Sequence, residues 1–267
     1  MKSQVDIYST TYSNFTSDVR ARIRQEVFGE DIGQHSWTTA AEQLSFAGKS
    51  GLTAASRLLE IGCGAGGPAI FLARSLGLSV TGIDINPAGI ATAETAAASA
   101  GVSDKVKFLC ADGGGALPFA GGTFDAIHLI DAINHLPERP ALLAEFHRLL
   151  RPGGSLLYTG SVVITGAISS EEIAARSSIG FFLFLPDGEN EKMLRGAGFT
   201  LLEMQNVTAS MTAISANWIT SRERWRDELI ASEGLKTFEY AQDFSRAVHG
   251  ISSSGKLSRF LYLARKS

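Results

Sequence analysis

Short apolar runs alternate with helical segments through the middle of the chain. Each run is rich in apolar residues and ends beside glycine or an acidic residue, a pattern typical of buried strands. The predicted strands lie at 57–62, 79–85, 106–112, 124–131 and 155–160. The segments between them carry the proline and glycine signals of helix starts and stops, at 68–77, 87–101 and 138–150. This alternation predicts an α/β fold, a doubly wound parallel sheet joined by right-handed crossovers.

The two ends of the chain depart from this alternation. Residues 1–50 are expected to form a helical cap, and 51–207 the core. Residues 208–257 have helical character and precede a last strand at 258–267. Because fifty residues are far more than an ordinary connection needs, they are expected to form a lid over a ligand, or else an insert for packing or dimerisation.

Composition narrows the partners that the chain can have. Its 267 residues are 45% hydrophobic and 19% charged, with a net charge of -3. A nucleic-acid site would need clustered Lys and Arg, and the densest basic run, 221–229, is interleaved with acids and reads as a solvated helix face. The two cysteines suggest a reducing compartment, and no signal peptide or membrane span is recognisable. We expect a cytoplasmic protein with a small-molecule substrate, no nucleic acid, no membrane and no metal, either monomeric or a homodimer.

The stretch "LLEIGCGAGG" at 58–67 combines a buried strand with a glycine loop. Gly62, Gly64 and Gly66 fit G-x-G-x-G, while Gly67 in place of Gly66 completes the dinucleotide fingerprint G-x-G-x-x-G. A loop between a strand and a helix offers backbone N–H groups to a ligand, and glycine permits the close approach. Either spacing alone leaves the ligand open.

Three acidic residues at strand ends distinguish the possible ligands. Glu60 lies two residues before the first glycine, where a carboxylate repels a pyrophosphate but attracts an ammonium group. Asp84 ends the second strand, where a carboxylate can accept both ribose hydroxyls. Asp112 ends the third strand and can meet an adenine amino group. A ligand with adenine, ribose and an ammonium group but no phosphate is S-adenosylmethionine.

With these residues the chain resembles the class I S-adenosylmethionine-dependent methyltransferases. The similar stretches are "LLEIGCGAG", "VTGIDIN", "VKFLCAD", "FDAIHLIDAINHL" and "RLLRPGGSLLY". The resemblance implies a Rossmann-like sheet of seven strands, with the last one antiparallel. It also implies that the cofactor is contacted by the glycine loop and by Glu60, Asp84, Ile85, Asp112, Gly113 and the backbone around Ile130.

The chemistry is expected after the fourth strand, since ligands of open α/β sheets bind at the carboxyl ends of strands. His135 is the candidate base for removing a proton from the acceptor. Asp131 can orient it or bind a cationic substrate, although an Asx-turn would explain this aspartate equally well.

A narrower resemblance concerns small-amine acceptors. "IDAINHL" and "FGEDI" are similar to stretches of phosphoethanolamine and other small-amine N-methyltransferases. That similarity implies a tyrosine of the N-terminal helix, Tyr12 or Tyr8, paired with His135. The phosphate-binding residues of these enzymes are not recognisable here, and the segment after the fifth strand is apolar. His35, Trp37, Phe181 and Phe182 are therefore expected to line a pocket for a moderately apolar substrate.

Several functions fit these features. The first is methyl transfer to nitrogen of a small molecule, followed by transfer to oxygen and then to carbon. A second class is an NAD-dependent oxidoreductase, which shares the glycine loop and the acid of the second strand. A third is a cofactor-binding protein without catalysis.

Overall fold

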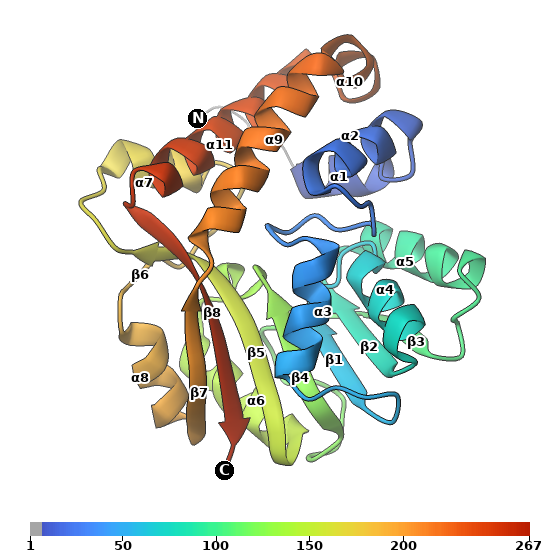
Figure 1. Ribbon diagram of the computed structural model, residues 1–267, viewed down its shortest axis with the longest axis vertical. Coiled ribbons are helices and arrows are strands. Elements are labelled where there is room, and N and C mark those ends of the chain that lie inside the picture. Colours follow the sequence, from blue (N-terminus) through green and yellow to red (C-terminus); the bar gives the residue numbers. More distant parts are fainter. Residues whose placement is uncertain (1–6) are drawn as a thin grey trace.

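A mixed β-sheet forms the centre of the molecule (Figure 1). The computed structural model describes residues 7–267, with side chains from residue 10 onward. The eight strands run in the order β3-β2-β1-β4-β5-β8-β7, with β6 paired to β5. Their bounds are β1 Arg57–Ile61, β2 Ser79–Asp84, β3 Val106–Cys110, β4 Phe124–Ile130, β5 Leu150–Ile164, β6 Leu185–Pro186, β7 Phe199–Asn206 and β8 Leu257–Lys266.

The strand directions confirm the predicted doubly wound sheet. Strands β1 to β5 pair in parallel where they are neighbours, and β8 is antiparallel to both β5 and β7. The expected count of seven is exceeded because the two-residue strand β6 adds to the edge of β5. Strand β5 is also longer than the predicted 155–160, since it begins at Leu150, before "RPGG", and continues past the bulge between Gly160 and Val163.

Helices cover both faces of the sheet, and alternate residues of each strand face opposite layers. Leu58 packs in the cluster formed by α3, α4 and α5, whereas its neighbour Leu59 packs in the cluster formed with α6 and α8. The helices of these layers are α3 Ala40–Lys49, α4 Gly67–Leu76, α5 Pro87–Ser99, α6 Arg139–Leu149 and α8 Glu189–Gly196. This period of two buries both sides of each central strand.

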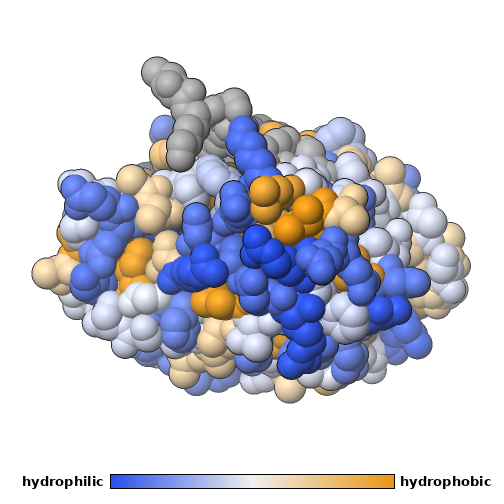
Figure 2. Space-filling model, turned by 90° about the horizontal axis from the view of Figure 1, so that it is seen from above, coloured by the Kyte–Doolittle hydropathy of each residue, from blue (hydrophilic) through white to orange (hydrophobic). Residues whose placement is uncertain are grey.

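The remaining helices gather at the carboxyl ends of the parallel strands (Figure 1). They are α1 Ile7–Ser13, α2 Asp18–Phe28, α7 Ser170–Arg176, α9 Thr208–Arg224, α10 Arg226–Glu233 and α11 Leu235–Ser253, with the short 3-10 helix η1 Ile133–His135 below them. One apolar cluster joins α2 to α9, α10 and α11, through Ile23, Phe28, Ile214 and Phe238 among others. We call α1, α2 and α9–α11 the lid. Figure 2 shows this end from above, with hydrophilic residues over most of the visible face and hydrophobic ones in separate patches.

Helix α3 belongs with the sheet rather than with this lid. Its Phe46 packs on Leu157 and Leu261, and its Ala47 packs in the cluster that contains Leu58. The N-terminal fifty residues therefore serve two purposes, because α2 builds the lid and α3 covers the sheet. None of the helices in the described part of the chain is both long and apolar enough to cross a membrane.

Candidate active site

A cavity of about 820 Å3 lies between the carboxyl ends of the strands and the lid. Its floor is the glycine loop with the ends of β1, β2 and β4, and its roof is made by α2, α9 and α11. Ligand pockets commonly measure roughly 300–1,000 Å3, so this one is at the large end. It has room for a cofactor and an acceptor side by side.

The glycine loop is shaped by close backbone contacts. Gly62 and Gly64 have φ of 76° and 54°, in the left-handed region that favours glycine. A Cβ atom at Gly67 would lie 2.2 Å from the carbonyl oxygen of Ile32, so the segment before α3 rests directly on the start of α4. Both predicted glycine spacings therefore have a structural role. Gly62, Gly64 and Gly66 form the turn, and Gly67 allows the segment before α3 to approach.

Glu60 faces the cavity as a buried acid, and its Oε2 atom has no hydrogen-bond partner among the described residues. Burial, and to a smaller extent the charge of Asp84, raises its pKa to about 8. A buried carboxyl group without a partner is costly unless something pairs with it. A cationic ammonium group is the partner that this position fits.

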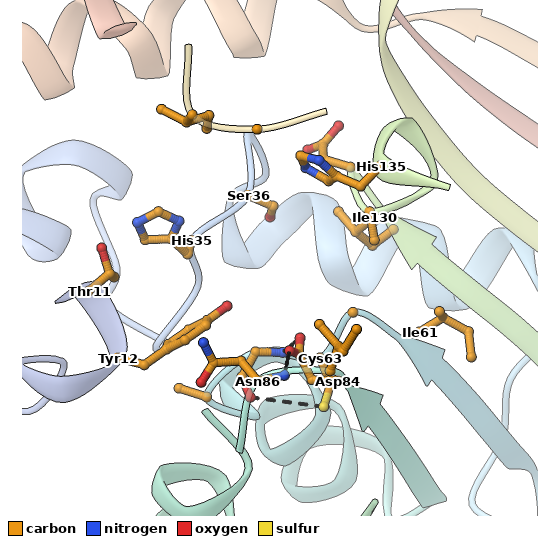
Figure 3. A pocket seen from close by; sticks show the side chains of 18 of the residues that line it. Thr11, Tyr12, His35, Ser36, Ile61, Cys63, Asp84, Asn86, Ile130 and His135 are labelled. Carbon is orange, nitrogen blue, oxygen red and sulfur yellow. Dashed lines mark hydrogen bonds between the residues drawn. The ribbon is translucent and has the colours of Figure 1, made fainter. Parts of the chain in front are cut away.

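Asp84 both supports the loop and lines the cavity (Figure 3). Its Oδ2 accepts a hydrogen bond from the Gly64 N–H at 2.8 Å, and its Oδ1 accepts one from the Asn86 N–H at 2.8 Å. Each carboxylate oxygen can accept a further bond, so ribose hydroxyls can still be held. Burial raises the pKa of Asp84, and these backbone bonds oppose the rise.

The other residues expected at the cofactor also line the cavity. Ile85 is 70% exposed, unusual for an apolar side chain, and offers an apolar surface to a flat ring. Asp112 is exposed and accepts a hydrogen bond from the Gly114 N–H at 2.8 Å, forming an Asx-turn. Gly113 and Ile130 lie on the same wall.

His135 belongs to η1 and faces the cavity from the end of β4 (Figure 3). Its Nδ1 bonds to the carbonyl oxygen of Phe181 at 2.9 Å. Because a carbonyl only accepts, Nδ1 carries the hydrogen and Nε2 is the basic nitrogen of the neutral ring. Burial is the main cause that lowers the pKa of His135; nearby Arg176 adds to the effect, while the Phe181 bond and Asp131 oppose it.

Asp131 is held by a residue that the sequence did not indicate. Its Oδ1 pairs with the buried Arg259 Nε at 2.9 Å, and its Oδ2 accepts the Trp37 N–H at 3.0 Å. With φ of 58°, it is the one non-glycine residue in the left-handed region in the described chain. Asp131 therefore connects the end of β4 with β8 and with the segment before α3. The Nδ1 atom of His135, which Asp131 was expected to orient, is bonded to the Phe181 carbonyl instead.

Of the two predicted tyrosines, Tyr12 lies at the glycine loop rather than beside His135. Tyr12 leans over the glycine loop, where its hydroxyl would lie 2.7 Å from a Cβ atom at Gly64. Figure 3 shows Tyr12 and His135 at opposite sides of the cavity. The side chain of Tyr8 lies outside the described residues.

Three of the four residues predicted for the acceptor pocket line the cavity. His35, Trp37 and Phe182 line the cavity, and the Phe182 ring lies 4.4 Å from the ring of His135. The Phe181 side chain is 55% exposed and is absent from the wall. Phe181 contributes its backbone carbonyl oxygen instead, which is bonded to the Nδ1 atom of His135.

Several residues of the wall were missed by the sequence analysis. They come from helices that carry no motif and are Arg20, Arg176, Trp218, Arg222 and Glu233. The prediction of a solvated face at 221–229 is wrong for Arg222, which is 5% exposed. Its side chain extends from α9 to Glu233 at the end of α10 and is buried there. For Trp218, Arg222 and Glu233, the one available signal was their place inside the long insert that was expected to cover the ligand; Arg20 and Arg176 lie outside it.

Comparisons with known proteins indicate the class to which the chain belongs. Residues 58–154 match a family model described as a methyltransferase domain. The chain is 29% identical over 237 residues to the 27-O-demethylrifamycin SV methyltransferase of Amycolatopsis mediterranei, covering 84% of this chain and 85% of that one. It is 28% identical over 243 residues to phosphoethanolamine N-methyltransferase 1 of Triticum aestivum, covering 91% of this chain but 47% of the wheat protein.

A solved structure gives the fold independently. The cyclopropane synthase MmaA2 of Mycobacterium tuberculosis superposes with a TM-score of 0.83 at 17% identity, over 100% of both chains. Such a likeness shows the fold alone.

Together the domain match and the curated relatives identify the chain as an S-adenosylmethionine-dependent methyltransferase of small molecules. The residues fit the cofactor of this class. Glu60 has an unpartnered buried oxygen for its ammonium group, Asp84 has free acceptor capacity for its ribose, and Gly62 and Gly64 add no side chains of their own to the loop. Neither the oxidoreductase nor the non-catalytic alternative is favoured by these matches.

Proposed function

We propose that the chain transfers the methyl group to an oxygen of a small, largely apolar acceptor, with His135 as the base. Its cofactor contacts are Glu60, the glycine loop, Asp84, Ile85, Asp112, Gly113 and Ile130, as the sequence predicted. When bound, S-adenosylmethionine supplies a methyl group that is already activated for transfer. The chain has to align the acceptor and to take up the proton that the acceptor loses.

The orientation of His135 is the observation that carries this proposal. With Nδ1 bound to the Phe181 carbonyl, Nε2 is the atom that can accept a hydroxyl proton. The lowered pKa keeps the ring neutral near neutral pH, so that it is ready to act as a base. After transfer the ring is an imidazolium ion, and it returns its proton to solvent once the products have left.

The charges around His135 favour oxygen over the nitrogen that the sequence motifs suggested first. Arg176 lies near the ring of His135, since both contact Phe182, and its guanidinium carbon is 4.1 Å from the centre of the Phe182 ring. Asp131 is engaged with Arg259. A developing phenolate or alkoxide is stabilised by such a cation, whereas a protonated amine is repelled by it.

The relatives support both acceptor atoms. The Amycolatopsis mediterranei relative is named for a substrate that lacks an O-methyl group, and it covers 84% of this chain. Nitrogen is the second candidate, because the wheat relative is named an N-methyltransferase and covers 91% of this chain.

Matched acceptors test the choice of atom. The purified chain is incubated with S-adenosylmethionine labelled in its methyl group and with pairs of phenols and anilines of the same carbon skeleton. We expect the label in methyl ethers. Label in methylamines alone would identify nitrogen as the acceptor atom and contradict the oxygen proposal. Transfer to neither series would also contradict the proposal.

A further inference from the structure

A buried charge cluster lies in the cavity wall contributed by the lid. Glu233 of α10 pairs with Arg222 of α9 at 2.6 Å and with Arg20 of α2. The side chains of Arg20, Arg222 and Glu233 are 9%, 6% and 1% exposed. All three residues line the cavity.

The cluster carries more positive than negative charge. Two guanidinium groups share one carboxylate, and Arg24, one turn further along α2 than Arg20, is paired with Asp31 at 2.8 Å. The Nε atoms of Arg20 and Arg222 are buried and have no acceptor within the part of the chain that the structure describes. Buried charges and donors of this kind are costly unless they are paired.

The neighbouring His35 lies in the positive electrostatic field of the same arginines. The pKa of His35 is lowered to about 4, first by its burial and then by the charges of Arg20, Arg24 and Arg222. Glu233 pairs with two of these three arginines, so one negative charge faces two positive charges within the cluster.

The cluster lies beside His35, on a different side of the cavity from the proposed base His135. His35, whose pKa is lowered by these arginines, contacts Trp218 of the lid and lies apart from His135 in Figure 3. Apolar surfaces of Trp37, Trp218 and Phe244 line the cavity as well. A ligand that reaches both places needs an apolar middle and different polar groups at its two ends.

We propose that Arg20 and Arg222 form a subsite for a carboxylate of the acceptor, at the end of that molecule remote from the methylated oxygen. The inference rests on the proposed function, since it adds to the oxygen acceptor a second recognised group. The substrate class is then a hydroxylated acid with an apolar body. Glu233 is a positioning residue that holds the two guanidinium groups toward the cavity.

The test measures binding without requiring turnover. ω-(4-Hydroxyphenyl)alkanoic acids with chains of different length, each beside its methyl ester, are titrated calorimetrically into the chain loaded with S-adenosylhomocysteine. Charge-assisted bonds to arginine predict that at least one acid binds about tenfold or more tightly than its ester. If no acid is preferred over its ester, or if nothing in the series binds, the subsite is contradicted.

Variants separate recognition from a structural role. Arg222→Gln is expected to reduce the preference for acid over ester to less than about threefold, whereas Glu233→Gln is expected to increase it, because a negative charge is removed. Arg226→Gln is the matched control, because Arg226 also stacks on Phe238 but is 41% exposed and outside the cavity. A cluster that only held the lid together would lower thermal stability in both cluster variants and leave the preference unchanged.

The two proposals fail in different ways. Acids that bind through Arg222 but are not methylated would overturn the oxygen-transfer proposal and keep the subsite. Methylated phenols that show no preference for a carboxylate would keep the oxygen-transfer proposal and overturn the subsite.

Discussion

His135 and Phe181 are joined by a hydrogen bond from the ring Nδ1 to the backbone carbonyl oxygen, 2.9 Å long. The bond connects η1 with the segment between α7 and β6, two parts of the chain that are 46 residues apart in sequence. Since the acceptor is a backbone atom, the orientation of the imidazole does not depend on the Phe181 side chain. The tautomer needed for a base at Nε2 is therefore set by the fold.

Glu60 makes cofactor binding depend on pH. Its pKa of about 8 means that the carboxyl group is mostly protonated at neutral pH before the cofactor binds. A cationic ammonium favours the ionised form, so binding releases a proton, and affinity rises as pH increases from about 6 toward 8. Above that range the cofactor's own amine loses its charge, near pH 8, and affinity falls again.

Calorimetry in buffers of different ionisation enthalpy measures this proton release. In Glu60→Gln we expect weaker binding and no release from this site at pH 7. Equal proton release by the wild type and by Glu60→Gln would remove Glu60 from the ammonium site.

Asp84→Asn is expected to weaken cofactor binding by about 1.5–3 kcal/mol, roughly 10- to 150-fold, because charge-assisted hydrogen bonds to the ribose are lost. Asparagine is preferred to alanine because Asp84 also accepts the Gly64 and Asn86 N–H groups, and the amide oxygen keeps one of these bonds. Asp104→Asn, at an exposed position beyond α5, is the control. Equal affinities of the two variants in calorimetry would argue that Asp84 only supports the loop.

The core sheet and the cofactor wall were predictable because their signals are local. A strand, a glycine loop and an acid at the next strand end occur within thirty residues, and Glu60, Gly64 and Asp84 all line the cavity. Right-handed crossovers then bring the strand ends to one edge of the sheet.

The cavity residues contributed by the lid were harder to predict from the sequence, because their positions depend on contacts between helices that are distant along the chain. Arg20 forms an ion pair with Glu233, which is 213 residues away in sequence. Arg259 forms one with Asp131, 128 residues away. An arginine on a helix face has no periodic or motif signal that distinguishes burial against an acid from exposure to water. Arg222 was misread for this reason.

Asp131→Ala is expected to lower the free energy of unfolding by about 3–5 kcal/mol, because Arg259 would be left buried and unpaired. Asp243→Ala removes the surface salt bridge to Arg246, whose side chain is 57% exposed, and is expected to cost about 1 kcal/mol or less. Urea unfolding of both variants makes the comparison. Similar losses would mean that the Asp131–Arg259 pair contributes no more than a surface pair.

The lid is expected to respond to the cofactor as one unit, because α2 and α9–α11 share an apolar cluster. Amide hydrogen exchange should slow in both segments when S-adenosylhomocysteine is added. Helix α3, packed on the sheet through Phe46, should change little and serves as the internal reference. Unchanged exchange in α2 and α9 would favour a packing role for the insert.

The most direct test of the account is the turnover of His135→Gln on a phenol that the wild type methylates. A lost general base predicts a fall in kcat of about 10²–10⁴, with cofactor affinity unchanged. Phe181→Ala, which keeps the carbonyl, should remain within about threefold of the wild type. At saturating cofactor, the wild-type kcat should be level at neutral pH and fall only on acidification below 6.5, as Nε2 of His135 is protonated. A His135→Gln enzyme within threefold of the wild-type kcat, with the same pH profile, would contradict the role of His135 as the base.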